Sequence, residues 1–71
     1  MTVTDTAIHA NIAALNEMLA QIAAIAAEAQ NANNRGERNL AIGTLTELEA
    51  LLPDAAAILN TTLALHRFSK R

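Results

Sequence analysis

The side chains best suited to binding chemistry gather in one short stretch, residues 31–40, which reads NANNRGERNL. Arg35 and Arg38 supply guanidinium groups, which hold phosphates and carboxylates through charge-assisted hydrogen bonds. The amides of Asn34 and Asn39 are able to hydrogen-bond a base or a sugar. The stretch therefore predicts a site for a small anion, and a solvated turn is the alternative interpretation.

Catalytic and metal-binding patterns do not accompany this stretch. Thr44 and Thr46 lack a histidine nearby in sequence that would act as a base, and Ser69 lies in a tail that is expected to fray. His9 and His66 are the only histidines, and two histidines without a third ligand make a poor zinc site. Glu17 and Glu28 have no histidine three residues on, so the di-iron bundle pattern is missing. We therefore expect binding without catalysis, metal or cofactor.

The basic residues are confined to two places, although the chain carries a net charge of −2. They are Arg35, Arg38, Arg67, Lys70 and Arg71. Cations at the end of a helix complement its dipole, which is the simplest role for Arg67. Packing of tips against tips, or of tips against the basic tails of another subunit that carry Arg67, would converge several arginines on one small anion. The absence of a basic helix face argues against a DNA or RNA polymer as the ligand.

Two helices must position these residues. The first is expected over about residues 5–30, with Thr4 or Thr6 as its cap and Asp5 near the positive end of its dipole. Its apolar residues recur at spacings of three and four: Ile8, Ile12, Leu15, Leu19, Ile22, Ala26 and Ala29, with Met18 and Ile25 beside them. Residues 31–37 then form a turn, where Asn34 and Glu37 have the spacing of a capping box.

The second helix is expected over about residues 38–67. Its apolar side is formed by Leu40, Leu45, Leu48, Leu52, Leu59 and Leu63, with Ile42, Leu51, Ala55, Ala56 and Ile58. Gly43 suggests a close helix approach. Pro53 removes a helical hydrogen bond, so the helix kinks or breaks near Leu51 and Leu52, and we favour a kinked continuous helix. The fold is then all-α, one long antiparallel helical hairpin over residues 1–71.

The composition predicts self-assembly. Hydrophobic residues make up 52% of a 71-residue chain that has no cysteine, and one hairpin offers a single layer of contact in which to bury them. The longest charge-free runs fall short of the roughly 18 to 20 residues that a membrane span needs. No secretory signal pattern opens the chain. We expect a cytoplasmic homo-oligomer that does not enter the membrane.

The segment from Arg38 to Leu48, RNLAIGTLTEL, resembles the helix that carries an Arg, a Leu-Ala-Ile step, a Thr and Leu-x-Glu in the phage anti-CBASS sponge proteins. That resemblance implies a small helical protein that assembles into rings and sequesters a cyclic oligonucleotide signal without cleaving it. Among the predicted ligand contacts, it implies Arg38 again and adds a hydroxyl of Thr44 or Thr46. The family's aromatic residues after Leu-x-Glu are replaced here by Leu51, Leu52 and Pro53.

Two functions follow from these patterns and from what the resemblance implies. The first is a sponge that binds a cyclic di- or oligonucleotide between subunits and so antagonises antiphage defence, in the host cytoplasm if a phage encodes it. Its predicted ligand contacts are Asn34, Arg35, Arg38, Asn39, Thr44 and Arg67. The alternative is a homo-oligomeric scaffold or protein-interaction hairpin without a small-molecule ligand.

Overall fold

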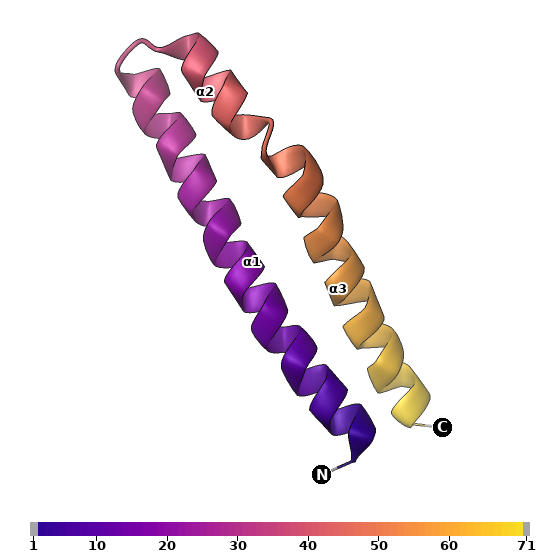
Figure 1. Ribbon diagram of the computed structural model, residues 1–71. Helices are drawn as coiled ribbons and strands as arrows, with labels where there is room; N and C mark the ends of the chain where they lie inside the picture. Colours follow the sequence, from indigo (N-terminus) through magenta and orange to yellow (C-terminus); the bar gives the residue numbers. More distant parts are fainter. Residues whose placement is uncertain (1, 71) are drawn as a thin grey trace.

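The computed structural model describes residues 2–70 as a two-armed helical hairpin (Figure 1). The first arm is α1 (Val3–Asn34), and the second contains α2 (Arg38–Leu45) and α3 (Leu48–Ser69). The arms lie side by side over their length, so the two ends of the chain lie together, opposite the turn. The Cα atoms extend over 53 × 17 × 12 Å. The predicted all-α hairpin with a bent second helix is confirmed.

The cap of the first helix lies two residues before Thr4 and four residues before Thr6, the two predicted caps. Thr2 is the N-cap residue, and its Oγ1 accepts a hydrogen bond from the Asp5 N–H at 3.1 Å. The Asp5 carboxylate in turn accepts from the Thr2 N–H at 3.2 Å, which completes a capping box. Thr6 instead donates its hydroxyl to the Thr2 carbonyl. The prediction of Thr4 or Thr6 as the cap was therefore wrong.

α1 continues through Asn34, four residues past the end expected from its asparagines. Packing stabilises this last turn, because Ala29 and Ala32 are buried with Ala41 of the second arm. The helix then stops in a Schellman motif, in which the Gly36 N–H donates to the Asn33 carbonyl at 3.0 Å and the next N–H to the Ala32 carbonyl at 2.9 Å. Gly36 has φ +80°, which only glycine adopts without strain.

The second arm bends at Thr46 and Glu47, upstream of the predicted site at Leu51 and Leu52. Both bend residues keep right-handed helical angles, so the arm is bent and the chain direction continues. The hydrogen bonds tighten there to a spacing of three, from the Glu47 N–H to Thr44 and from the Glu49 N–H to Thr46. Pro53 lies within α3 and cannot donate to the Glu49 carbonyl. The bend at Thr46 and Glu47 therefore lies just before Glu49, whose carbonyl receives no hydrogen bond from Pro53.

The seam between the arms follows a strict alternation of three- and four-residue steps. All but one of the less exposed residues of α1 fall on this pattern, Ala7 being the exception; they are Thr4, Ile8, Asn11, Leu15, Met18, Ile22, Ile25, Ala29 and Ala32. The same holds for the second arm, where Ala64 is the exception and the pattern contains Ala41, Thr44, Leu48, Leu51, Ala55, Ile58, Thr62 and Leu65. A 3.5-residue repeat of this kind is the a/d seam of an antiparallel coiled coil.

Several residues expected on the inner side instead lie outside the seam. They are 40–56% exposed: Ile12, Leu19, Leu40, Ile42, Leu45, Leu52, Leu59 and Leu63. Each helix carries two adjacent apolar rows, and the hairpin buries only one of them. The predicted close approach at Gly43 is also wrong, since no atom lies within 4 Å of a Cβ built there. The close approach occurs at the alanines near the turn.

Candidate functional site

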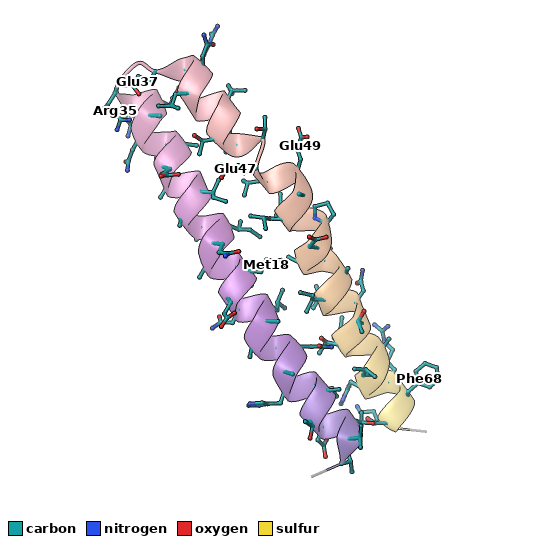
Figure 2. The ribbon with its side chains drawn as sticks, viewed as in Figure 1. Met18, Arg35, Glu37, Glu47, Glu49 and Phe68 are labelled. Carbon is teal, nitrogen blue, oxygen red and sulfur yellow. The ribbon has the colours of Figure 1, made fainter. Side chains whose placement is uncertain are left out.

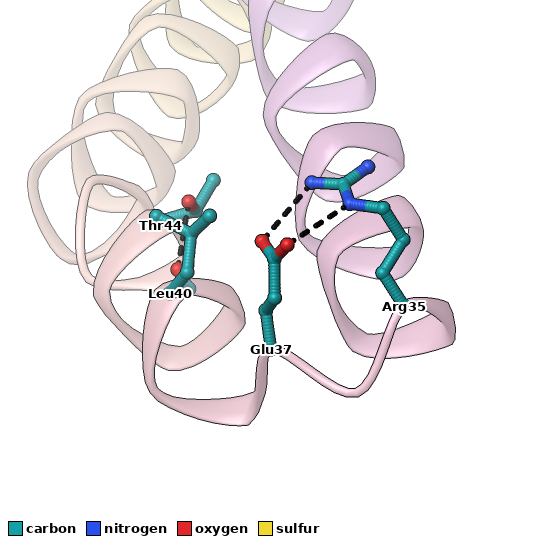
Figure 3. A network of polar contacts seen from close by, with 4 residues as sticks. All are labelled: Arg35, Glu37, Leu40 and Thr44. Carbon is teal, nitrogen blue, oxygen red and sulfur yellow. Dashed lines mark hydrogen bonds and ion pairs between the residues drawn. The ribbon is translucent and has the colours of Figure 1, made fainter.

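The tip of the hairpin carries an ion pair between two of its charged residues. The Arg35 guanidinium donates to both carboxylate oxygens of Glu37, with Nε–Oε1 at 3.3 Å and Nη2–Oε2 at 3.2 Å (Figure 3). The hydrogen bond and the charge of Glu37 raise the pKa of Arg35 above its usual value. Arg35 therefore has its own acidic partner within the turn.

This pairing leaves the start of α2 open. Glu37 is the N-cap residue of α2 but makes no side-chain capping bond, so the predicted capping box between Asn34 and Glu37 is not formed. The first N–H groups of α2 have no side-chain acceptor among the described residues, and the first bond of the helix runs from the Ala41 N–H to the Glu37 carbonyl. Arg38 sits at this position, is exposed, and makes no ion pair within residues 2–70. Open N–H groups beside an arginine suit an anion.

The structure brings together four of the six predicted ligand contacts. Asn34, Arg35, Arg38 and Asn39 all lie at the tip and are exposed. Thr44 lies further along α2 on the seam side, and its hydroxyl donates to the Leu40 carbonyl at 2.9 Å (Figure 3).

Arg67 lies at the other end of the hairpin. It belongs to the last turn of α3, beside Phe68, whereas Arg35 and Glu37 mark the tip (Figure 2). The long dimension of the hairpin is 53 Å, so one chain cannot place Arg67 and Arg38 around one small anion. Their convergence would require a second chain.

A shallow hollow opens next to the tip. It has a volume of about 390 Å³ and is lined by both arms: Ala26, Ala29, Gln30, Asn33, Ala41, Ile42 and Leu45. The alanines create it, because their methyl groups leave space that larger side chains would fill. Its lining is mostly apolar and lacks charged residues, so the hollow fits a hydrocarbon side chain better than a phosphate.

The hollow also identifies which exposed residues share a side of the hairpin. Two antiparallel helices are related by a two-fold axis perpendicular to the plane that contains both helix axes. Residues that occupy the same position of the seven-residue repeat in the two helices therefore lie on the same broad side of the hairpin. Ala26 and Leu45 occupy equivalent positions and line one hollow, as this rule requires. Extending the repeat defines the apolar face: Ile12, Leu19, Ala26, Ile42, Leu45, Leu52, Leu59 and Leu63.

The opposite broad side has a different character. The same repeat places four acidic residues there, Glu17, Glu28, Glu47 and Asp54, which we call the acidic face. The sequence alone did not assign these acidic residues to one side of the hairpin. The sequence does contain a sign of this division. Glu47 and Asp54 are seven residues apart and so lie in one row, while Leu45, Leu52 and Leu59 form a second seven-residue row that is offset from the first by two residues.

The open end of the hairpin holds both histidines. His9 and His66 lie in the first and last parts of the two arms. Among the described residues, no group of three or more His, Cys, Asp or Glu side chains is placed to hold a metal ion.

Both arms meet the length and composition criteria of a membrane span. Val3–Asn34 and Arg38–Ser69 each contain an 18-residue window with a mean hydropathy of 1.3. Those windows are only 0% and 6% buried within the single chain, whereas the core helix of a soluble protein would be mostly buried. The apolar surface of the hairpin therefore calls for a covering partner, either protein or lipid.

Comparisons with known proteins found no match to any protein family, any characterised protein or any solved structure.

Proposed function

We propose that the protein is a non-enzymatic, self-assembling hairpin that sequesters a cyclic nucleotide signal between subunits and thereby antagonises antiphage defence. The ligand class is a cyclic di- or oligonucleotide, whose phosphates would bind at the tips. The place of action is the cytoplasm of the host. The tip binds the anion, and the helical arms assemble the subunits.

The observation that carries this proposal is the geometry around Arg38. Its guanidinium has no acidic partner among the described residues, and it stands beside the uncapped N–H groups of α2. The Glu37 carboxylate, which was predicted to take part in capping α2, is held by Arg35 instead. Charge-assisted hydrogen bonds from an arginine and a helix start are a common way to hold a phosphate.

Two further observations support the same function. Asn34 and Asn39 also lie at the tip, and they are exposed, so their amides are able to contact a base or a sugar. The resemblance of the segment from Arg38 to Leu48 to the anti-CBASS sponge helix points to the same ligand class. The exposed apolar face supports assembly, which would collect several tips around one ligand.

Isothermal titration calorimetry with cyclic di- and trinucleotides tests the proposal. Arg38→Ala should weaken binding by about 10- to 100-fold, because a hydrogen bond to a charged group contributes roughly 1.5 to 3 kcal/mol. Arg35→Ala should have a smaller effect, since Arg35 already pairs with Glu37. Affinity should also fall as salt is added, which is the signature of phosphate contacts.

Glu37→Gln is the matched variant for the ion pair. It frees Arg35 and removes a negative charge from the tip, so binding should strengthen. A wild-type protein that binds none of the cyclic nucleotides, or an Arg38→Ala variant that binds as tightly as wild type, would contradict the proposal.

A homo-oligomeric scaffold without a small ligand is the second candidate function. The apolar face favours it, because exposed leucines and isoleucines in one continuous area mark an interaction surface. Under this function, changes to Arg35 and Arg38 leave assembly and activity intact, whereas polar substitutions on the apolar face abolish both. Calorimetry on wild type separates the two functions, since a scaffold gives no heat of nucleotide binding.

A further inference from the structure

We propose that the apolar face is covered by a second copy of this chain, packed face to face with both tips at the same end. The result is an antiparallel four-helix bundle made of two hairpins. This inference rests on the self-assembly in the proposed function, but it does not depend on a nucleotide ligand.

The broad side that contains the apolar face is large enough for a stable dimer interface. Cα extents of 53 Å by 17 Å outline a broad side of roughly 900 Å², compared with about 800 Å² per partner in a standard protein interface. Two rows line the centre of this side, Ile12, Leu19 and Ala26 on α1 and Leu45, Leu52 and Leu59 on the second arm, and neither row carries an acidic or basic residue. Glu49 lies one row further out, seven residues after Ile42 and fourteen before Leu63, so it belongs to the rim of the face. A charge-free centre of this kind is typical of a four-helix bundle core.

The opposite side does not fit a second copy. Packing two acidic faces together would bring Glu28, Glu47 and Asp54 of one chain against the same residues of the other. Like charges brought out of water repel each other strongly. The two broad sides therefore differ, and only the apolar face is suited to self-association.

The orientation follows from the ends of the two rows. The central row of the apolar face on α1, continued in steps of seven residues, begins at Asp5, passes through Leu19 and ends at Asn33. The corresponding row on the second arm begins at Arg38, passes through Leu52 and ends at His66. With tips together, α1 of one chain faces the second arm of the other. Asp5 then lies opposite the second copy's His66, and Asn33 opposite the second copy's Arg38.

Reversing one hairpin gives a poorer match. With tip against tail, each row faces its own reverse, so Arg38 lies opposite the second copy's His66, whose side chain offers it no carboxylate or amide oxygen. Asp5 then faces only an asparagine. Charge complementarity therefore favours the arrangement with tips together.

The hollow supports the same packing. With tips together, the second copy's Leu45 lies opposite Ala26, which lines the hollow. Leu45 is 40% exposed and Ile42 is 56% exposed in the single chain, so both project outward to fill the opposing hollow. The arrangement also brings Arg38 of both copies to one end, where the proposed ligand site lies.

Sedimentation without nucleotide tests the interface. Wild type should be dimeric or a multiple of the dimer. Leu19→Gln and Leu52→Gln should each raise the dissociation constant at least about 100-fold, because each change removes two buried leucines per dimer. Leu40→Gln is the matched control: it is the same substitution at a residue 54% exposed but outside the apolar face, and it should leave assembly unchanged. Circular dichroism should show all three variants helical.

The orientation is measured by spin-label distances, since the native chain has no cysteine. A single label at Asn34→Cys should give an intersubunit distance near the width of the bundle. A distance close to the 53 Å length of the hairpin would overturn the arrangement with tips together. A monomeric wild type, equal effects of Leu40→Gln and Leu52→Gln, or flotation of the unassembled chain with phosphatidylcholine vesicles would overturn the dimer itself.

These readouts are separate from the calorimetry of the proposed function. A dimer with the expected label distance that binds no cyclic nucleotide would contradict the sponge and leave this interface intact. A monomer that binds cyclic nucleotide would overturn this interface and leave the ligand assignment intact.

Discussion

The two glycines of the chain provide a matched test of the turn and of the second arm. Gly36 has φ +80°, whereas Gly43 lies within the right-handed helix α2. A Cβ added at either position meets no atom within 4 Å. Substitution by alanine therefore reports backbone preference alone, and the two substitutions should have opposite effects on the free energy of unfolding.

The magnitudes follow from the two conformations. Gly36→Ala forces an L-residue into the left-handed region, which costs about 1 to 2 kcal/mol. Gly43→Ala improves helix propensity by about 0.5 to 1 kcal/mol. In a domain of this size, about 1 kcal/mol shifts the melting temperature by roughly 4 to 8 °C. We expect Gly36→Ala to melt about 4 to 16 °C below wild type and Gly43→Ala about 2 to 8 °C above it.

Thermal unfolding followed by circular dichroism measures both shifts. All samples need the same protein concentration, because the melting temperature of a self-associating protein depends on it. A neutral Gly36→Ala would show that the turn does not hold the left-handed conformation at residue 36. A destabilised Gly43→Ala would show that another chain packs against that side of α2, which would contradict the assignment of the interface to the apolar face.

Three further substitutions test the seam and the first cap. Ala32→Leu should lower the free energy of unfolding by about 1 to 3 kcal/mol, because Ala32 is only 2% exposed between the arms. Ala24 is exposed, so Ala24→Leu should leave the free energy of unfolding unchanged. Equal melting temperatures for the two variants would contradict the close approach near the turn. Thr2→Ala removes the capping box of α1 and should lower the free energy of unfolding by about 0.5 to 2 kcal/mol in urea titrations. Thr62→Val replaces a half-buried hydroxyl, which donates to the Ile58 carbonyl at 2.7 Å, with a methyl group. We expect the free energy of unfolding to rise by up to about 1 kcal/mol, because the methyl group adds buried apolar surface. A fall in the free energy of unfolding would show that this hydrogen bond stabilises α3.

The candidate site was partly predictable. The concentration of Arg35, Arg38, Asn34 and Asn39 in one stretch indicated the tip, because residues close in sequence around a turn remain close in space. The roles of Arg35 and Glu37 were not predictable in this way. Whether Glu37 caps α2 or pairs with Arg35 depends on the backbone path through Gly36, and the Schellman motif turns Glu37 toward the arginine.

The sequence by itself determined two long helices, the turn between them and the presence of more apolar surface than one hairpin buries. These properties are local, since they depend on the spacing of apolar residues, on Gly36 and on the total number of leucines, isoleucines and alanines.

Only the tertiary structure decided which apolar row of each helix lies in the seam. A small rotation of a helix about its axis would replace one apolar row in the seam by the adjacent one. Because both rows are apolar, hydrophobicity alone does not determine which of them is buried. The choice is made near the turn, where the three residues between α1 and α2 bring the arms close together and only the methyl groups of Ala29, Ala32 and Ala41 fit. That contact sets the rotation of both helices, and the leucines of the neighbouring rows are left on the apolar face.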